Sequence, residues 1–212
     1  MELIAPEVNE YLKKLIPPRN TILEEMETYA SEVKFPIIGP VAGQFCYTIA
    51  RMSNAKRIFE LGSGYGYSTA WFARAVMENG GGSVYHVVWD EELSQKARKY
   101  LHGLGYDDIV HYRVSEAVSA LKDTEGPFDL IFNDIDKEGY PASLPVIKEK
   151  LRPGGIVIVD NVLWSGRIFD PEDVKPETEG IREFTALISK DSDFTVNILP
   201  IRDGLLVAMK TG

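Results

Sequence analysis

Cysteine, basic charge and long apolar runs are all scarce in this 212-residue chain. Cys46 is the single cysteine, so no disulfide forms within the chain. The 23 lysines and arginines face 32 aspartates and glutamates, which gives a net charge of -9, whereas binding to nucleic acid or to anionic membranes requires a basic face. No apolar run reaches the roughly 20 residues that cross a bilayer, and the first nine residues lack a secretion-signal pattern. We therefore expect a cytoplasmic protein with neither nucleic acid nor membrane as a partner.

The N-terminal quarter has the apolar spacing of helices. With 44% hydrophobic residues, the chain can bury a large core, and its length fits one domain. Apolar periodicity predicts helices over 6–16, 20–33 and 41–52. Pro17-Pro18 separates the first two, and a loop with two prolines over 34–40 precedes the third. This helical front end is expected to cover a site as a cap or to form a subunit interface.

From residue 55 onward, expected strands alternate with expected helices. The strands are predicted at 57–61, 83–88, 109–114, 128–134 and 155–160, with helices at 68–78, 91–104, 115–121 and 140–151. This alternation is typical of βαβ units and a parallel sheet. After a polar loop that follows Trp164, a helix near 179–189 and strands at 194–200 and 205–209 are expected. The short connection between these last strands indicates an antiparallel hairpin at the sheet edge.

A glycine-rich turn follows the first expected strand. Its three glycines occupy alternate positions, Gly62, Gly64 and Gly66, which lets bare backbone approach a nucleotide-like ligand. Tyr67 stands where a dinucleotide fingerprint requires a third glycine, and the carboxylate of Glu60 would repel a phosphate. A ligand with an ammonium group, such as S-adenosylmethionine, suits the turn better. A tight turn without a ligand is the competing interpretation.

The second expected strand lacks the acid that such a site normally uses. A carboxylate at this strand end usually binds the ribose hydroxyls of a nucleoside. Here Val88 ends the strand, and Asp90 is the first carboxylate after it. Two interpretations stay open: Asp90 substitutes through a shift of the loop, or the cofactor binds more weakly.

Two later strands end in oxygen-bearing side chains. Asp134 ends one, and Asp160 with Asn161 ends the other. Because the carboxyl ends of parallel strands lie at one edge, these residues are expected to converge. Oxygen donors without a neighbouring His or Cys suit a hard divalent cation, Mg²⁺ or another such as Mn²⁺ or Ca²⁺. Lys137 is a candidate base, because a nearby cation disfavours its ammonium form. Solvated strand ends and an exposed loop lysine are the competing interpretations.

Other reactive or aromatic side chains carry weaker signals. The histidines His86, His102 and His111 have no ligand-like spacing and are expected to be structural. Cys46, in an apolar helix, is expected to be a small core residue. Tyr140 and Trp164 are equally consistent with the walls of an aromatic pocket and with the core.

Taken together, these segments resemble the cation-dependent O-methyltransferases, the group that contains catechol and caffeoyl-coenzyme A O-methyltransferases. The resemblance runs from Gly43-Gln44-Phe45 through the glycine turn to Asp134-Ile-Asp-Lys137, Asp160-Asn-Val-Leu-Trp164 and Asp203-Gly204. It implies an α/β Rossmann-like methyltransferase fold with a seven-stranded, mostly parallel sheet and usually a homodimer. The expected organisation is a single domain over 1–212, with a helical cap or interface over 1–53 and the core over 54–212.

The resemblance also implies S-adenosylmethionine as methyl donor and a small vicinal dihydroxy aromatic as acceptor. Asp134, Asp160 and Asn161 would hold the metal, and Lys137 and Asp134 would be catalytic. The predicted cofactor contacts are Ile38, Glu60, Gly62, Ser63, Gly64, Ser68, Glu116, Ala117 and Asp134, together with Asp90 in place of the missing acid.

Two other functions stay open from the sequence. Because Val88 stands where a ribose-binding acid is expected, one possibility is a degenerate methyltransferase fold that serves as a binding or dimerisation module. The presence of both Asp134 and Lys137 counts against it. A nucleotide-dependent oxidoreductase on a related sheet is the second, and both Tyr67 and Glu60 count against that.

Overall fold

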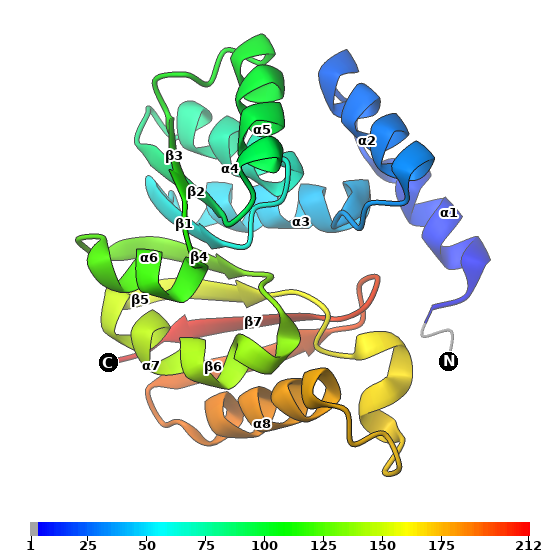
Figure 1. Cartoon of the computed structure of the whole chain (residues 1–212), viewed down its shortest axis with the longest axis vertical. Helices are drawn as coiled ribbons and strands as arrows, with labels where there is room; N and C mark the ends of the chain where they lie inside the picture. Colours follow the sequence, from blue (N-terminus) through cyan, green and yellow to red (C-terminus); the bar gives the residue numbers. More distant parts are fainter. Residues whose placement is uncertain (1–3) are drawn as a thin grey trace.

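A single twisted sheet forms the centre of the molecule (Figure 1). The computed structural model describes residues 4–212, and within them seven strands pair in the order β3-β2-β1-β4-β5-β7-β6. The strands are β1 Arg57–Leu61, β2 Ser83–Val88, β3 Val110–Val114, β4 Phe128–Asn133, β5 Leu151–Val159, β6 Phe194–Leu199 and β7 Leu205–Lys210. Strands β1 to β5 run parallel, and β7 is antiparallel to both β5 and β6. The predicted α/β fold with a C-terminal antiparallel hairpin is confirmed.

Helices cover both faces of the sheet. They are α1 Pro6–Leu15, α2 Thr21–Val33, α3 Gly39–Met52, α4 Tyr67–Glu78, α5 Glu91–Gly103, α6 Ala117–Asp123, α7 Tyr140–Lys150 and α8 Pro176–Lys190, with 3₁₀ turns η1 Lys137–Gly139 and η2 Trp164–Phe169. In Figure 1, α3, α4 and α5 lie on one face, and α6, α7 and α8 lie on the other. Across residues 4–212, no helix combines the length and apolar character needed to span a membrane.

Each face of the sheet carries its own apolar core. Trp71 and Phe72 of α4 are fully buried with residues of α3 and α5 on one side. Phe128 of β4 and Phe184 of α8 are buried on the other side. The sheet is therefore covered on both faces, as expected for parallel strands joined by helices.

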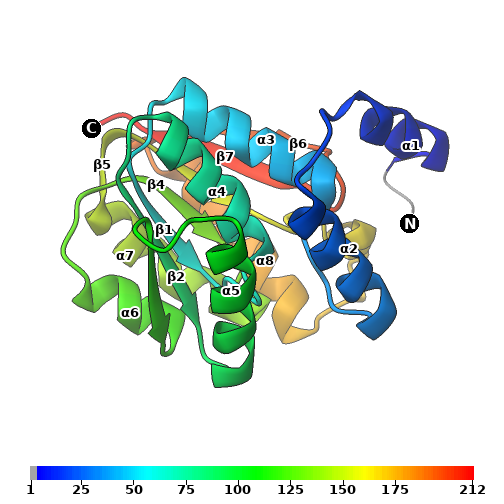
Figure 2. The same ribbon diagram turned by 90° about the horizontal axis from the view of Figure 1, so that it is seen from above.

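The first helix stands apart from this core. Helix α1 has no buried residue and leaves Val8, Tyr11 and Leu15 exposed. Helix α2 instead buries Leu23 and Met26. Seen from above, α1 lies at the margin of the molecule, beyond α2 (Figure 2). The predicted helical front end thus consists of two packed helices, α2 and α3, and an outer helix, α1, with exposed apolar residues.

The strand order reverses between β1 and β4, and this places the glycine turn beside Asp134. Strands β2 and β3 extend to one side of β1, whereas β4 and β5 extend to the other. Gly62 has a φ of 85°, and a Cβ there would lie 2.5 Å from the carbonyl oxygen of Asp134. Only glycine allows this approach. Ligands of open α/β sheets bind at such a reversal point.

Several element boundaries differ from the expected ones. Strand β5 begins at Leu151 and passes through Pro153 and Gly154, whereas the sequence predicted a helix through residue 151 and a strand from residue 155. Leu151 pairs with Phe128, and Arg152 donates to Asp129 at 2.7 Å, which holds this segment extended. Helix α8 begins at Pro176 rather than near residue 179, because proline suits the first helical turn.

Candidate active site

The glycine turn is tied to the neighbouring strand by Ser63. The backbone N–H of Ser63 donates to the carbonyl of Val87 at 2.9 Å, and the Val87 N–H donates to Ser63 Oγ at 2.9 Å. Gly66, with a φ of 91°, then precedes the first residue of α4. These bonds fix the turn, including Gly64, at the carboxyl ends of β1 and β2. Ser68 follows in the first turn of α4 and is buried.

Glu60 is a fully buried carboxylate directly before this turn. Its Oε2 accepts a hydrogen bond from Thr69, whereas Oε1 is buried without a well-aligned partner among the described residues. Burial raises the pKa of Glu60 to about 7, although the hydroxyls of Ser68, Thr69 and Ser63 act in the opposite direction. A buried carboxylate oxygen without a partner is costly unless a donor reaches it. This arrangement fits a ligand that carries an ammonium group.

His86 completes the buried network behind Glu60. Its Nδ1 lies 3.0 Å from Thr69 Oγ1. Desolvation lowers the pKa of His86 to about 3, so the ring is neutral and adds no charge near Glu60. His102 and His111 contact Asp107 and Ser83. The structural roles expected for the three histidines are confirmed.

Two tyrosines of the glycine turn hold α2 over it. Tyr65 donates to the carbonyl of Met26 at 2.9 Å, and Tyr67 donates to Glu27 Oε1 at 2.8 Å. Both rings are buried. Ile38, directly before α3, is also buried close to this junction. The sequence showed the tyrosines but not their partners, which lie about 40 residues away along the chain.

Three further predicted cofactor residues begin helices at the same sheet edge. Glu116 accepts from the N–H groups of Val118 and Ser119 at 2.8 and 2.7 Å, and Ala117 is the first residue of α6. Asp90 is exposed and accepts from Leu93 at 3.0 Å, which caps α5. The glycine turn, Asp90 and Glu116 thus follow the adjacent strands β1, β2 and β3.

The aspartates at the ends of β4 and β5 lie next to one another, as predicted. The Asp160 N–H donates to the carbonyl of Asn133 at 3.1 Å, the residue before Asp134. Asp160 is almost fully buried, and burial together with the Asp134 charge raises its pKa to about 7. A buried carboxylate next to a second carboxylate favours a cation between them.

Asn161 presents the third oxygen donor. Its Nδ2 donates to Asp203 Oδ2 at 3.4 Å. This bond uses the amide nitrogen and not the carbonyl oxygen, the atom that a hard cation binds. In the part of the chain that the structure describes, no cluster of three or more His, Cys, Asp or Glu side chains could hold a metal. The side chains of Asp134, Asp160 and Asn161 offer only two carboxylates and one amide, and oxygen atoms of this kind suit Mg²⁺ better than a softer metal.

Lys137 is held inside the site rather than exposed. Its Nζ donates to Asp134 Oδ1 at 2.7 Å and to the carbonyl of Ile135 at 3.0 Å, and its side chain is 10% exposed. The ammonium lies 5.1 Å from the ring centroid of Tyr140 and 6.0 Å from that of Trp164. The competing interpretation of a solvated loop lysine is wrong.

The backbone of Lys137 is positioned by α8. A Cβ at Gly180 would lie 2.3 Å from the Lys137 carbonyl oxygen, so only glycine lets the helix pack this closely. The sequence did not reveal this role, because nothing near Gly180 along the chain marks it as a neighbour of Lys137.

Arg202 is a site residue that sequence reasoning missed. Its Nη1 donates to Asp160 Oδ2 at 2.9 Å, and it has a φ of 54°. Positive φ values also occur at Asn161, Trp164 and Ser165. Among residues 4–212, the only other non-glycine residues with a positive φ are Lys34 and Asn54. Backbone strain of this kind gathers at functional sites. The corner around Asp160 therefore carries much of the strain in the fold.

A cavity of about 480 Å³ lies beside this corner. It is lined by Lys13, Arg19, Glu27, Ala30, Ser31, Phe35, Pro36, Ile37, Pro40 and Arg202. Arg202 therefore connects the cavity to Asp160, and the loop before α3 forms another wall. The lining combines apolar side chains with charged ones, so a small, partly polar ligand suits it.

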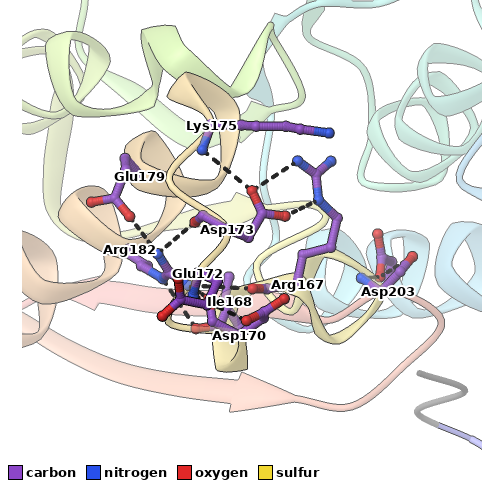
Figure 3. A network of polar contacts seen from close by, with 10 residues as sticks. Arg167, Ile168, Asp170, Glu172, Asp173, Lys175, Glu179, Arg182 and Asp203 are labelled. Atoms are coloured by element: carbon purple, nitrogen blue, oxygen red, sulfur yellow. Dashed lines mark hydrogen bonds and ion pairs between the residues drawn. The ribbon is translucent and has the colours of Figure 1, made fainter.

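The loop after Trp164 is organised by one arginine (Figure 3). Arg182 of α8 donates to the carbonyls of Ile168, Asp173 and Arg167 at 3.1, 2.8 and 3.3 Å, and also to that of Asp170. Arg167 pairs with Asp173 at 2.6 Å and holds the pKa of that carboxyl well below its usual range. Asp203 accepts from Ser165 at the start of the loop. Sequence reasoning expected only an irregular polar loop here.

Tyr140 and Trp164 have different environments in the structure. Tyr140 is fully buried, packs on Phe184 and donates to the carbonyl of Asp160 at 2.9 Å, so it is a core residue. Trp164 is partly buried with Arg167 over its ring. Cys46 is fully buried in α3, and its expected place in the core is confirmed.

The sheet order, the acid-first glycine turn and the buried Glu60 together define a methyltransferase of the Rossmann-like class. A family model described as O-methyltransferase matches residues 14–211, and the chain belongs to this family. It is 30% identical to a catechol O-methyltransferase of Niastella koreensis, over 97% of each chain.

Solved structures agree with this assignment. An O-methyltransferase from Bacillus cereus in complex with SAH has a TM-score of 0.88 and 29% identity, over 97% of each chain. The O-methyltransferase TomG from Streptomyces achromogenes in complex with SAM has a TM-score of 0.87 and 28% identity, over 97% of this chain and 96% of that one. The protein is an S-adenosylmethionine-dependent O-methyltransferase. The oxidoreductase and the inactive binding module are thereby set aside.

Proposed function

We propose that the enzyme methylates one of two adjacent hydroxyls on a small aromatic acceptor and that it requires a divalent cation. The observation that carries the proposal is the convergence of Asp134, Asp160 and Lys137 at the sheet edge beside the glycine turn. Similar proteins named as catechol and probable caffeoyl-CoA O-methyltransferases support the acceptor class.

Each residue has a task in the proposed reaction. Asp134, Asp160 and Asn161 would hold the cation, which supplies positive charge that stabilises a deprotonated acceptor hydroxyl. Lys137, in its neutral amine form, accepts the hydroxyl proton at Nζ and becomes the ammonium that pairs with Asp134. Glu60 orients the methyl donor through its ammonium group. The acceptor oxygen, held in line, forms its bond to the methyl carbon as the carbon–sulfur bond breaks.

The cavity next to Arg202 is the proposed entrance for the acceptor. Its walls include the loop before α3 and five residues of the N-terminal region, the first Lys13 and the last Ser31, which supports the cap interpretation of residues 1–53. The exposed apolar residues of α1 support a second role in a homodimer. The homodimer and the cytoplasmic location stay predictions.

Metal dependence is tested by methyl transfer from S-adenosylmethionine to a panel of catechols, with Mg²⁺ and with chelator. Chelation is expected to lower the rate at least 100-fold and added Mg²⁺ to restore it, because the cation carries the charge of the acceptor oxygen. Asp160→Asn should lower the rate while SAH binding measured by calorimetry stays unchanged. Full activity under chelation would overturn the proposed metal role.

A further inference from the structure

Val88 lies at the carboxyl end of β2, beside the glycine turn. It is the last residue of β2 and is 4% exposed. The preceding residue, Val87, is hydrogen-bonded to Ser63 of the glycine turn through both its N–H and its carbonyl. The N–H of Ser115 donates to the Val88 carbonyl at 3.1 Å, which ties the end of β3 to the same point. A carboxylate at the end of this strand normally binds the ribose hydroxyls, and valine offers none.

Asp90 and Glu116, the first carboxylates after β2 and β3, do not replace the missing acid. Asp90 accepts from Leu93 and caps α5. Glu116 uses both carboxylate oxygens, one for Val118 and one for Ser119, and caps α6. Either side chain would have to leave a helix N-terminus to reach the ribose, and helix N-termini favour the negative charge that these residues supply.

Trp89 is an exposed aromatic residue directly after β2. It follows Val88 directly and is 79% exposed, although a large indole ring is usually buried in a protein of this size. Stacking on an aromatic ring holds any base through its π face and does not depend on the sugar hydroxyls.

We propose that this enzyme binds the adenosyl group through apolar and stacking contacts of Val88 and Trp89, without a carboxylate on the ribose hydroxyls. The inference rests on cofactor binding at the glycine turn. The enzyme therefore accepts cofactors whose ribose lacks a hydroxyl, a tolerance that a carboxylate at this position would remove.

Calorimetric titration with SAH and with its 2′-deoxy and 3′-deoxy analogues tests the proposal. The wild-type dissociation constants are expected to differ less than about tenfold, since a charged hydrogen bond is worth about 10- to 150-fold. Val88→Glu should bind SAH at least tenfold more tightly than wild type does. Its increase in affinity for the deoxy analogues should be smaller. Trp89→Ala should weaken all three ligands by a similar factor.

Val88→Gln is the matched control, because it has the size of glutamate without the charge. Its increase in SAH affinity over wild type should be smaller than that of Val88→Glu. Thermal melting shows whether each variant is folded. A wild-type loss of tenfold or more on either deoxy analogue would overturn the proposal, and so would an equal gain of Val88→Glu for all three ligands. No SAH binding by the wild type would instead refute cofactor binding at the glycine turn, which separates the two failures.

Discussion

Glu60 shows how a single buried residue links stability to ligand binding. Its pKa is raised to about 7 from an ordinary 4.5, mainly by burial, so the native state favours the protonated form. The stability that this proton contributes is present in acid and is lost as the pH rises from about 4.5 to 7. An ammonium group needs the carboxylate, so ligand binding has the opposite pH dependence.

SAH is therefore expected to bind more tightly as the pH rises toward and above 7. One pH unit below the pKa of Glu60, only about a tenth of the carboxyl is ionised, which corresponds to an affinity about tenfold weaker. Calorimetry at pH 6 and pH 8 measures this difference. Glu60→Gln removes the titrating group and should bind weakly at both values. A wild-type affinity that does not change between them would contradict the role of Glu60.

The sequence revealed those site residues that lie close to one another along the chain, and it missed those whose partners are distant. Glu60 with its glycines, and Asp134 with Lys137, are close in sequence and follow apolar strands, so pattern and topology were enough to bring them together. Arg202 acts on Asp160 from 42 residues away. Its role depends on how the β6–β7 connection folds back on β5, and no local pattern encodes that distance.

Among the elements, α8 has the largest influence on the site beyond the strands themselves. Through Gly180 it packs on the backbone of Lys137, and through Arg182 it holds the loop after Trp164. The periodicity of the sequence predicted the helix but not these tasks, because periodicity shows only which face is apolar. The start of β5 was predicted four residues too late, at residue 155, because the expected helix ran through residue 151, whereas pairing of Leu151 with Phe128 of β4 keeps the chain extended.

Gly180→Ala tests the contact between α8 and η1. In an open helix the change would stabilise the protein by up to about 1 kcal/mol, but here the new Cβ meets a carbonyl oxygen at 2.3 Å. We expect destabilisation by about 1–3 kcal/mol and a lower kcat as Lys137 moves, with SAH affinity unchanged. Denaturant unfolding and steady-state kinetics measure both effects. Ser189→Ala, at an exposed position of the same helix, is the control, and an unchanged kcat in Gly180→Ala would contradict the positioning role.

At the scale of the whole molecule, the cofactor site joins segments from most of the fold. The glycine turn contacts β2 through Ser63, β4 through Gly62 and α2 through Tyr65. A ligand bound there interacts with the native arrangement of all these parts and not with the unfolded chain. Binding is therefore expected to stabilise the domain as one unit.

SAH at a hundredfold excess over its dissociation constant should raise the free energy of unfolding by about 2.7 kcal/mol. For a chain of this length, that corresponds to a rise in Tm of about 5–11 °C. Differential scanning calorimetry should show one transition that moves as a whole, and NAD at the same concentration should leave it unchanged. Two transitions, of which SAH moves only one, would show that the N-terminal helices unfold separately.

Arg182 also bears on which sequence changes the loop after Trp164 can accept. It holds the loop after Trp164 by four carbonyl oxygens, and every residue type supplies a carbonyl. The path of the loop is therefore largely independent of side chains such as the exposed Phe169. New residues can be introduced at such exposed positions without loss of the backbone route, provided that Arg182 and the Arg167–Asp173 pair are kept. The loop can therefore change its surface while its path over the sheet edge is preserved.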